Sequence, residues 1–292
     1  MTYAPDAWVI NYTNPMTLCV KALYGVFPEI KVNPVAVNHF TWLTKATYRN
    51  IDLFPYYKEF CKTYKDGYET DGTPVDANWA NNVHGNKEKV KIDLFNRFGW
   101  IAAAGDRHLA EFCEGKWYLE SPERVEEMRF WLTTVAWRKQ KQKSRLEKAA
   151  RLVSGEENVK IEETGEEGVN QIRALLGLDT LVTNVNIPNV GQIPNLPLGA
   201  VVETNAVFCA NSLTSVQAGE IPKEIYPLVS RICTEQELVA DGIAERDLNK
   251  IFNAFANDPL VTCGLDDAKK MFIEMCENTE KYLSMYDLNS LD

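Results

Sequence analysis

Three side chains that can do acid–base or anion chemistry stand next to one another at Asp106, Arg107 and His108. They follow Gly105 and an apolar run of small residues, and Glu111 lies one turn further on if the chain is helical there. A carboxylate, a permanent cation and an imidazole delivered together favour a site that moves protons or holds an anion. The alternative is an ordinary helix start with Asp106 as its cap and the other polar groups solvated.

Histidine is rare in this chain, with only three residues, His39, His84 and His108. His39 follows Asn38 inside an apolar, strand-like run at residues 35–43. A histidine in such a strand is usually a core residue with its hydrogen bonds satisfied, but neutral imidazole is also the commonest metal ligand. His84 lies in a polar stretch rich in Gly, Asn and Asp, which is typical of a surface loop.

The first element that could position a site is a strand, turn and helix at the start of the chain. Residues 7–10 form a short buried-strand pattern, and Asn14 before Pro15 predicts the N-cap and first residue of a helix that continues to Phe27. This order is a fragment of an α/β unit, whose turn lies at the carboxyl end of the strand where such sheets bind ligands. Asn14 is therefore either only a cap or a cap beside a site.

The remainder of the chain predicts an α+β body that is rich in helix and carries an antiparallel sheet. Strand patterns that predict the antiparallel pairing lie at residues 180–187 and 199–208. Helices are predicted at residues 52–65, 87–98 with Gly99 after the last turn, 121–154 with Ser121 as cap and Gly155 after it, and 223–283 with a break at 258–259. The sequence has no Gly-x-Gly-x-x-Gly turn, phosphate loop, Gly-x-Ser-x-Gly motif or paired-cysteine zinc spacing.

Composition narrows the class of partner. The chain has 292 residues and a formal net charge of −10, which repels phosphate backbones and anionic lipid, so neither nucleic acid nor a membrane is expected as a partner. Seven cysteines scattered singly, together with the lack of a signal peptide pattern, predict reduced thiols in a cytoplasmic protein. Residues 138–151 carry seven Lys or Arg, but interleaved Gln and Glu favour a solvated helix over a nucleic-acid surface.

Five stretches of the sequence, taken in order, resemble one protein family. They are residues 5–16, 37–42, 102–112, 183–189, and 195–197 with 199–206. Through them the chain resembles, over essentially its whole length, the carboxyl-terminal two-thirds of glycoside hydrolase family four, the NAD- and manganese-dependent glycosidases. It is most similar to the α-galacturonidase-like members. The resemblance implies an α/β remnant plus an α+β body, the C-terminal part of a lactate/malate-dehydrogenase-like glycosidase fold.

The resemblance also implies an activity and a set of site residues. It implies hydrolysis of α-glycosidic bonds, here of α-galacturonides, by oxidation of sugar C3 with NAD, elimination and addition of water, with Mn²⁺ polarising the C3 oxygen. The implied roles are a metal ligand at His39, substrate binding by Asn14, Asn38 and Arg107, and acid or base catalysis by Asp106 and His108. Arg107 would hold the carboxylate of a uronic acid. The alternative is that the 105–111 loop only shapes the pocket.

Two family segments have no counterpart in this sequence. The chain starts near the last strand of the family's dinucleotide-binding domain, and the segment after Lys31 that would carry a metal-ligating Cys next to His is also missing. Residues 1–31 are therefore expected to be a remnant of the nucleotide-binding domain, and residues 32–292 a substrate-binding, metal-binding and oligomerisation domain. Without the Gly-rich turn there is no helix N-terminus to hold pyrophosphate, so the chain alone is expected to bind NAD and Mn²⁺ poorly or to be inactive.

Three explanations of these losses stay open: a truncated gene, a split protein completed by another chain, or a remnant fold that serves assembly. The corresponding functions are a cytoplasmic glycosidase that acts on a sugar or uronic acid, a non-catalytic oligomerisation domain, and a sugar-binding module without turnover. A homo-oligomer is expected by resemblance to the family.

Overall fold

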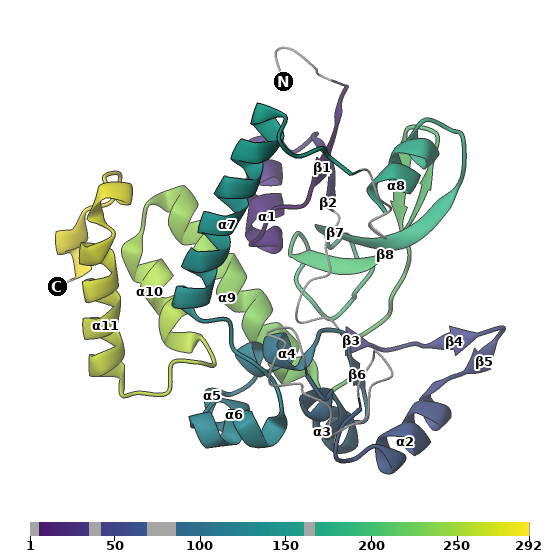
Figure 1. Cartoon of the computed structure of the whole chain (residues 1–292), viewed down its shortest axis with the longest axis horizontal. Helices are drawn as coiled ribbons and strands as arrows, with labels where there is room; N and C mark the ends of the chain where they lie inside the picture. Colours follow the sequence, from purple (N-terminus) through teal and green to yellow (C-terminus); the bar gives the residue numbers. More distant parts are fainter. Residues whose placement is uncertain (1–5, 35–41, 69–85, 161–166, 292) are drawn as a thin grey trace.

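The computed structural model describes residues 6–34, 42–68, 86–160 and 167–291, and its elements are mostly helices (Figure 1). The chain starts at the top of that view and ends on the left, beside the last long helix. The α-helices are α1 (Met16–Val26), α2 (Phe54–Thr63), α3 (Lys89–Phe98), α4 (Asp106–Phe112), α5 (Gly115–Tyr118), α6 (Pro122–Met128), α7 (Val135–Ser154), α8 (Gly168–Leu175), α9 (Tyr226–Glu245), α10 (Leu248–Asn257) and α11 (Leu265–Asn278), followed by two short 3₁₀ turns, Glu280–Tyr282 and Leu288–Leu291.

The predicted α/β unit at the start of the chain is confirmed. Strand β1 (Trp8–Asn11) pairs in parallel with β2 (Lys31–Pro34), and α1 forms the crossover between them. The predicted N-cap at Asn14 is wrong, because the cap position belongs to Pro15 and no side chain caps the helix. Pro15 has an extended backbone, with φ −73° and ψ 113°, so helical dihedral angles begin only at Met16.

The predicted antiparallel ribbon is also confirmed. Strand β7 (Leu181–Pro188) pairs with β8 (Val201–Cys209) along its full length, and a short strand that was not predicted, β9 (Ser212–Ser215), extends the sheet. Two further pairs are short. Strand β3 (Trp42–Leu43) pairs with β6 (Ile101–Ala102), and β4 (Thr47–Tyr48) forms a hairpin with β5 (Ile51–Asp52).

The single helix predicted over residues 121–154 is wrong in its middle. Helix α6 ends at Arg129, whose φ of 60° is left-handed, and α7 begins only at Val135. Between them Phe130 is buried and forms a bridge with Asn86, which requires extended backbone. A helical pattern in the sequence cannot reveal such a contact across 44 positions. The predicted ends are confirmed, because the Ser121 hydroxyl accepts a hydrogen bond from the Arg124 N–H and Gly155 closes α7.

The C-terminal helices contain one break more than the sequence predicted. The predicted interruption after α10 at Asp258 is confirmed, but Arg246, with φ of 59°, also separates α9 from α10. A Cβ at Gly242 would lie 2.6 Å from Ile251, so the glycine permits the close approach of these two helices. The predicted boundary between residues 1–31 and 32–292 stays a prediction.

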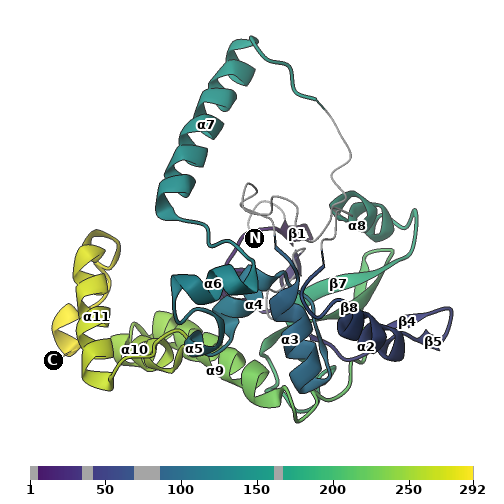
Figure 2. The same ribbon diagram turned by 60° about the horizontal axis from the view of Figure 1, so that its bottom comes forward.

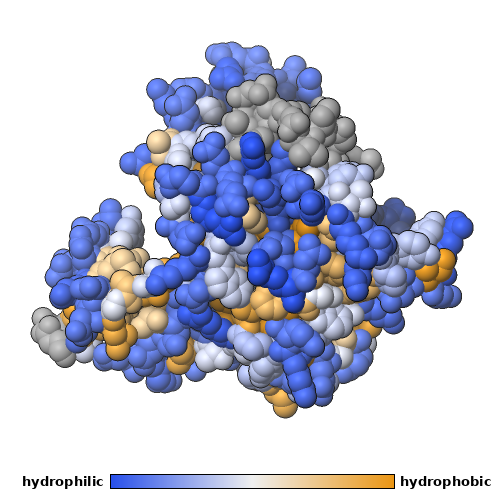
Figure 3. Space-filling model, turned by 90° about the horizontal axis from the view of Figure 1, so that it is seen from below, coloured by the Kyte–Doolittle hydropathy of each residue, from blue (hydrophilic) through white to orange (hydrophobic). Residues whose placement is uncertain are grey.

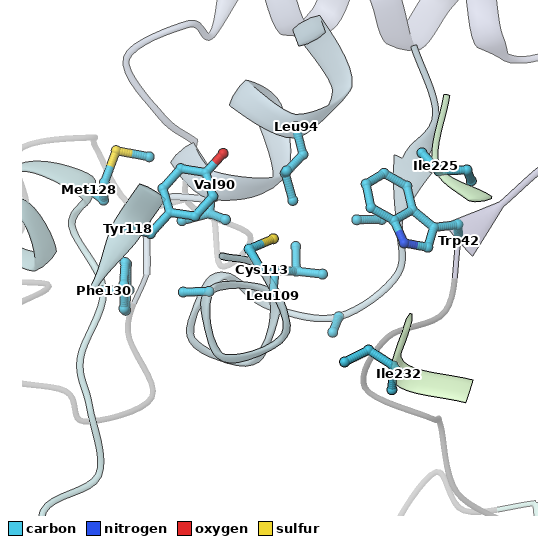
Figure 4. Close-up of a cluster of buried hydrophobic side chains, with 13 residues drawn as sticks. Trp42, Val90, Leu94, Leu109, Cys113, Tyr118, Met128, Phe130, Ile225 and Ile232 are labelled. Atoms are coloured by element: carbon cyan, nitrogen blue, oxygen red, sulfur yellow. The ribbon is translucent and has the colours of Figure 1, made fainter. Parts of the chain in front are cut away.

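The largest hydrophobic core anchors α4. Leu109 of this helix and Cys113, directly after its end, are fully buried among Val90 and Leu94 of α3, and Trp42 of β3 closes the cluster on one side (Figure 4). Burying side chains of this size contributes roughly 1.5–3 kcal/mol each. The first turn of α4, which carries the candidate site, therefore rests on the largest hydrophobic core among the described residues.

Helix α7 stands apart from that core. Figure 2 shows it rising away from the other helices before the chain returns towards α8. None of its 20 residues is buried. In the space-filling view, the coloured residues at the top of the molecule are mainly hydrophilic (Figure 3). Within the described ranges, no helix is long and apolar enough to cross a membrane.

Candidate functional site

The Asp106–Arg107–His108 triplet forms the first turn of α4, with Gly105 at the cap position. The triplet is reached through β6, whose Ala102 pairs with Trp42 of β3. Strand β3 is the described end of the apolar run in which the sequence places Asn38 and His39. The fold thus places the end of that run beside the segment that leads into Asp106, although 60 positions separate Trp42 from Ala102 in the sequence.

Asp106 is fully buried and its carboxylate faces the start of another helix. Its Oδ1 accepts a hydrogen bond of 3.1 Å from the backbone N–H of Lys91, in the first turn of α3. The carboxylate therefore caps α3 from outside rather than its own helix. Its Oδ2 is buried and has no hydrogen-bond partner among the described residues. Asp106 thus has one oxygen held by the fold and one oxygen open to a proton.

The environment of Asp106 favours its protonated form. Burial, strengthened by the nearby negative charge of Glu88, raises the pKa of Asp106 from 3.8 to about 7. The backbone N–H groups of Val90 and Lys91 and the charge of Lys91 lower this pKa but do not offset the burial. A carboxyl group with a pKa near neutrality can either give or take a proton at physiological pH, which suits an acid or base in catalysis.

Arg107 is held by a residue that sequence reasoning missed. Its Nη1 donates a hydrogen bond of 2.6 Å to the hydroxyl of Thr133, in the segment that joins α6 to α7. The contact fixes the guanidinium group while leaving other N–H donors of its planar fork for a ligand. Only the break between α6 and α7 brings Thr133 to this place, so no local sequence pattern could have indicated it.

His108 has a partner on its own helix. Its Nδ1 lies 3.1 Å from Oε2 of Glu111, one turn further on, as the spacing suggested. A carboxylate at Nδ1 favours the tautomer that carries the proton there and leaves Nε2 as the basic nitrogen. His108 is partly buried, so its ring is oriented as well as accessible.

The remaining predicted site residues make no described contact with the first turn of α4. Asn14 lies exposed between β1 and α1, and no described hydrogen bond or ion pair joins it to Asp106 or Arg107. Asn38, His39 and His84 lie outside the described residues. The predicted convergence of Asn14, His39 and Asp106 therefore stays a prediction.

The described residues do not by themselves fit a metal ion. No group of three or more His, Cys, Asp or Glu side chains within residues 6–34, 42–68, 86–160 and 167–291 is placed to hold one. His108 and Glu111 supply only two donors, and Asp106 directs an oxygen at a helix rather than into a ligand set. Zinc sites in proteins use three or four protein donors.

A groove opens from Arg107 along the first half of α7. Its volume is about 560 Å³, and its walls include Arg107, Thr133, Trp137, Arg138 and Arg145. None of the described residues that line it is acidic. The site therefore combines a buried, protonatable carboxyl group with a cationic, solvent-open groove that begins at the next residue.

A parallel strand–helix–strand unit on a helix-rich body defines the fold class as an α/β unit plus an α+β body. The first turn of α4 presents an acid, a cation and an imidazole on this fold. The chain belongs to glycosyl hydrolase family 4. The model of the family's C-terminal domain matches residues 35–261, and the model described as family 4 glycosyl hydrolase matches residues 1–49.

Individual relatives agree with this assignment. An α-galacturonidase of Thermoanaerobacterium saccharolyticum is 50% identical over 99% of this chain and 69% of its own length. The crystal structure of a Bacillus subtilis protein described as a glucosidase superposes with a TM-score of 0.86 at 41% identity, over 94% of this chain and 69% of that one. This likeness confirms the predicted fold class. A 6-phospho-α-glucosidase from gut microorganisms, solved with NAD and Mn²⁺, shares the fold with a TM-score of 0.71 at 19% identity, over 94% of this chain and 67% of that one.

The comparison with the Thermoanaerobacterium enzyme also bears on the missing segment. Its alignment runs over 323 residues, which exceeds the 292 residues of this chain. The relative therefore has residues inside the aligned region that have no counterpart here. This agrees with the expectation that a segment of the family is absent from this sequence.

Proposed function

We propose that this chain is a glycosidase that hydrolyses α-linked galacturonides. The observation that carries the proposal is the 50% identity to an α-galacturonidase across 99% of the chain. It is supported by the site, because Arg107 offers a fixed guanidinium group at the mouth of a cationic groove. A guanidinium group binds a carboxylate bidentately, which is the feature that distinguishes a uronic acid from a neutral hexose.

The roles proposed for the side chains follow from their surroundings. Asp106 is the acid or base, because its pKa of about 7 lets Oδ2 hold and release a proton at neutral pH. His108 is the second candidate for proton transfer, with its ring oriented by Glu111. Arg107 holds the uronate carboxylate, while Asn14 and Asn38 bind sugar hydroxyls and His39 binds metal. Because Asp106 has no exposed surface, a substrate reaches it only after neighbouring residues move.

The cofactors remain part of this proposal. Family relatives have been solved with NAD and Mn²⁺, and we expect turnover by this chain to need both. When bound, they supply hydride transfer and polarisation of a sugar oxygen. The described residues form no metal site, so the expected binding is weak unless another chain completes it. We also expect a homo-oligomer.

A second candidate is a non-catalytic domain that binds sugar or oligomerises. It is favoured by the residues of the α-galacturonidase that have no counterpart here. Such a protein would saturate with galacturonate but release no product.

The experiment that separates the two is the release of aglycone from an aryl α-galacturonide by the purified chain. NAD⁺, Mn²⁺ and reductant are each omitted in turn, and galacturonate binding is measured in parallel. Turnover that disappears without NAD⁺ or Mn²⁺ supports the glycosidase. Binding of galacturonate without any turnover, in a sample that does not bind NAD⁺, supports the non-catalytic domain.

A further inference from the structure

We propose that the groove between Arg107 and the first half of α7 is a binding site for the anionic chain of an oligogalacturonide, beyond the sugar that is cleaved. The inference deepens the proposed function and rests on it for the identity of the ligand. Arg107, in the first turn of α4, would bind the carboxylate of one uronate. The groove would bind the carboxylates of the sugars that follow it in the chain.

The first observation is an inversion of charge. The protein carries a net charge of −10, yet α7 contains seven Lys or Arg and only Glu147 as an acid. All five basic residues of its first half, up to Arg145, precede that acid. A segment so unlike the rest of the protein produces a local positive potential that attracts anions in spite of the overall charge.

The second observation is how these charges are compensated. Lys148 and Arg151, in the second half of α7, both lie within ion-pair distance of Glu157, at 3.7 and 3.1 Å. No described carboxylate pairs with Arg138 or Arg145, or with the lysines between them, in the half that lines the groove. Glu157 therefore neutralises the C-terminal half of α7, which is distant from α4. The N-terminal half, which lies near the first turn of α4, keeps its positive charge.

The third observation is the shape and lining of the groove. Arg107 and Thr133 line one end of the groove, and α7 contributes Arg138 and Arg145, with Gln142 between them, so the groove follows the helix. Residues four and three positions apart lie on one face, and Arg138 and Arg145 are separated by about 10 Å along the axis. Trp137 is half-buried and contributes an aromatic side chain to the same wall.

An oligouronide matches all three features. It carries one carboxylate on each sugar, so its charges recur along its length as the cations recur along the groove. Its first carboxylate is the group that the proposed function assigns to Arg107. A neutral oligosaccharide would pair with none of the cations.

The binding test uses trigalacturonate and follows the heat of binding by calorimetry, with intrinsic tryptophan fluorescence as a second signal. The variant Arg138→Gln/Arg145→Gln removes two charges that line the groove. The control Lys143→Gln/Lys148→Gln removes two charges from the same helix at positions that do not line it. Because both variants change the net charge equally, any difference between them reports local contact rather than the general field.

We expect the groove variant to weaken trigalacturonate binding by about two- to thirtyfold, from the roughly 0.2–1 kcal/mol that each exposed ionic contact contributes. The control is expected to weaken it less than the groove variant does. Wild-type binding should weaken as salt is raised, and neutral maltotriose should bind at least tenfold more weakly.

Three results would overturn the proposal. One is equal binding of trigalacturonate and maltotriose, and a second is an equal effect of the two variants. The third is a groove variant that retains trigalacturonate binding but changes another property. A changed sedimentation coefficient would make the groove a protein surface, and a lost affinity for duplex DNA would make it a nucleic-acid surface. Because binding is measured without turnover, a chain that binds trigalacturonate but releases no product would contradict only the proposed hydrolysis.

Discussion

At the scale of single residues, Asp106 serves both the fold and the proposed chemistry. Its Oδ1 caps α3 through Lys91, which ties the candidate acid to the packing of the core. Its Oδ2 lies buried without a partner among the described residues, close to the charge of Glu88. The hydrogen bond to α3 accounts for the position of the carboxylate, but the side-chain oxygen of an asparagine could accept the same bond. Capping therefore does not explain why a group that can ionise is buried at this position.

The raised pKa of Asp106 predicts a pH dependence of stability. The folded state binds the proton more tightly than the unfolded state, so the stability linked to this group is present below pH 4 and is lost as pH rises to about 7. A shift of this size corresponds to about 4 kcal/mol. We expect Asp106→Asn, measured by urea unfolding at several pH values, to gain stability relative to wild type between pH 4 and 8. An unchanged difference across that range would mean that Asp106 ionises normally.

The contact between Arg107 and Thr133 predicts a specific kinetic effect. Thr133→Val keeps the shape of the side chain but removes the hydroxyl that accepts the 2.6 Å hydrogen bond. We expect KM for an aryl α-galacturonide to rise about fivefold with little change in kcat, because one net hydrogen bond contributes about 1 kcal/mol. The control is Thr134→Val, at a neighbouring hydroxyl that caps α7 instead. If both variants leave KM unchanged, Thr133 does not position Arg107.

At the scale of elements, the sequence predicted what depends on local chemistry and missed what depends on distant contacts. The N-cap at Ser121, the glycines that end α3 and α7, and the β7–β8 ribbon all follow from residue types at fixed spacing. The break between α6 and α7 follows from the burial of Phe130 and its bridge to Asn86, which are far apart in sequence. The same break brings Thr133 to Arg107. Because the sequence did not predict the break, it did not predict this hydrogen bond either.

One of the family-like stretches has a structural explanation at this scale. Asn189 is buried after β7, and its Nδ2 lies 2.9, 3.0 and 3.1 Å from the carbonyl oxygens of Ile193, Leu196 and Pro197. Its Oδ1 accepts hydrogen bonds from the N–H groups of Gly191 and Ile193. One amide side chain thus holds together the loop that joins β7 to β8.

The loop therefore predicts a large cost for Asn189→Ala. The substitution leaves several buried backbone groups without partners, each costing about 1–3 kcal/mol. We expect a loss of about 2–4 kcal/mol in the free energy of unfolding, measured by denaturant titration. Asn195→Ala, which removes one pair of bonds to Ile221, serves as the comparison and should cost less. Equal, small effects would show that the loop does not depend on Asn189.

At the scale of the whole molecule, the family and the fold class were recognised from five stretches in register, and the fold agrees with them. The arrangement of the site was less predictable. The triplet at the start of α4 was identified from residue types alone, but its burial arises from α3 and the core, and the cationic groove arises from how α7 stands against the body. Such properties belong to packing between distant elements, which a single sequence does not display.

The lack of buried residues in α7 predicts that this helix unfolds independently of the core. Thr134→Ala removes the hydroxyl that accepts the Trp137 N–H, which should cost about 1 kcal/mol locally. We expect faster hydrogen exchange within α7 and no measurable change in global unfolding. Ser121→Ala, the same loss at α6, should instead lower global stability, because α6 packs Met128 into the core. A global loss in Thr134→Ala would show that α7 is part of the cooperative unit.

The most direct measurement compares kcat/KM for an aryl α-galacturonide and the matching aryl α-galactoside, which differ only at the C6 carboxylate. The two substrates are assayed with the wild type and with Arg107→Gln, with NAD⁺ and Mn²⁺ present. We predict that the wild type prefers the galacturonide and that Arg107→Gln lowers its kcat/KM by about 10–100-fold, as for a charged hydrogen bond of roughly 1.5–3 kcal/mol, with little effect on the galactoside. A wild type that prefers the galactoside, or a substrate ratio that Arg107→Gln leaves unchanged, would contradict the proposed site.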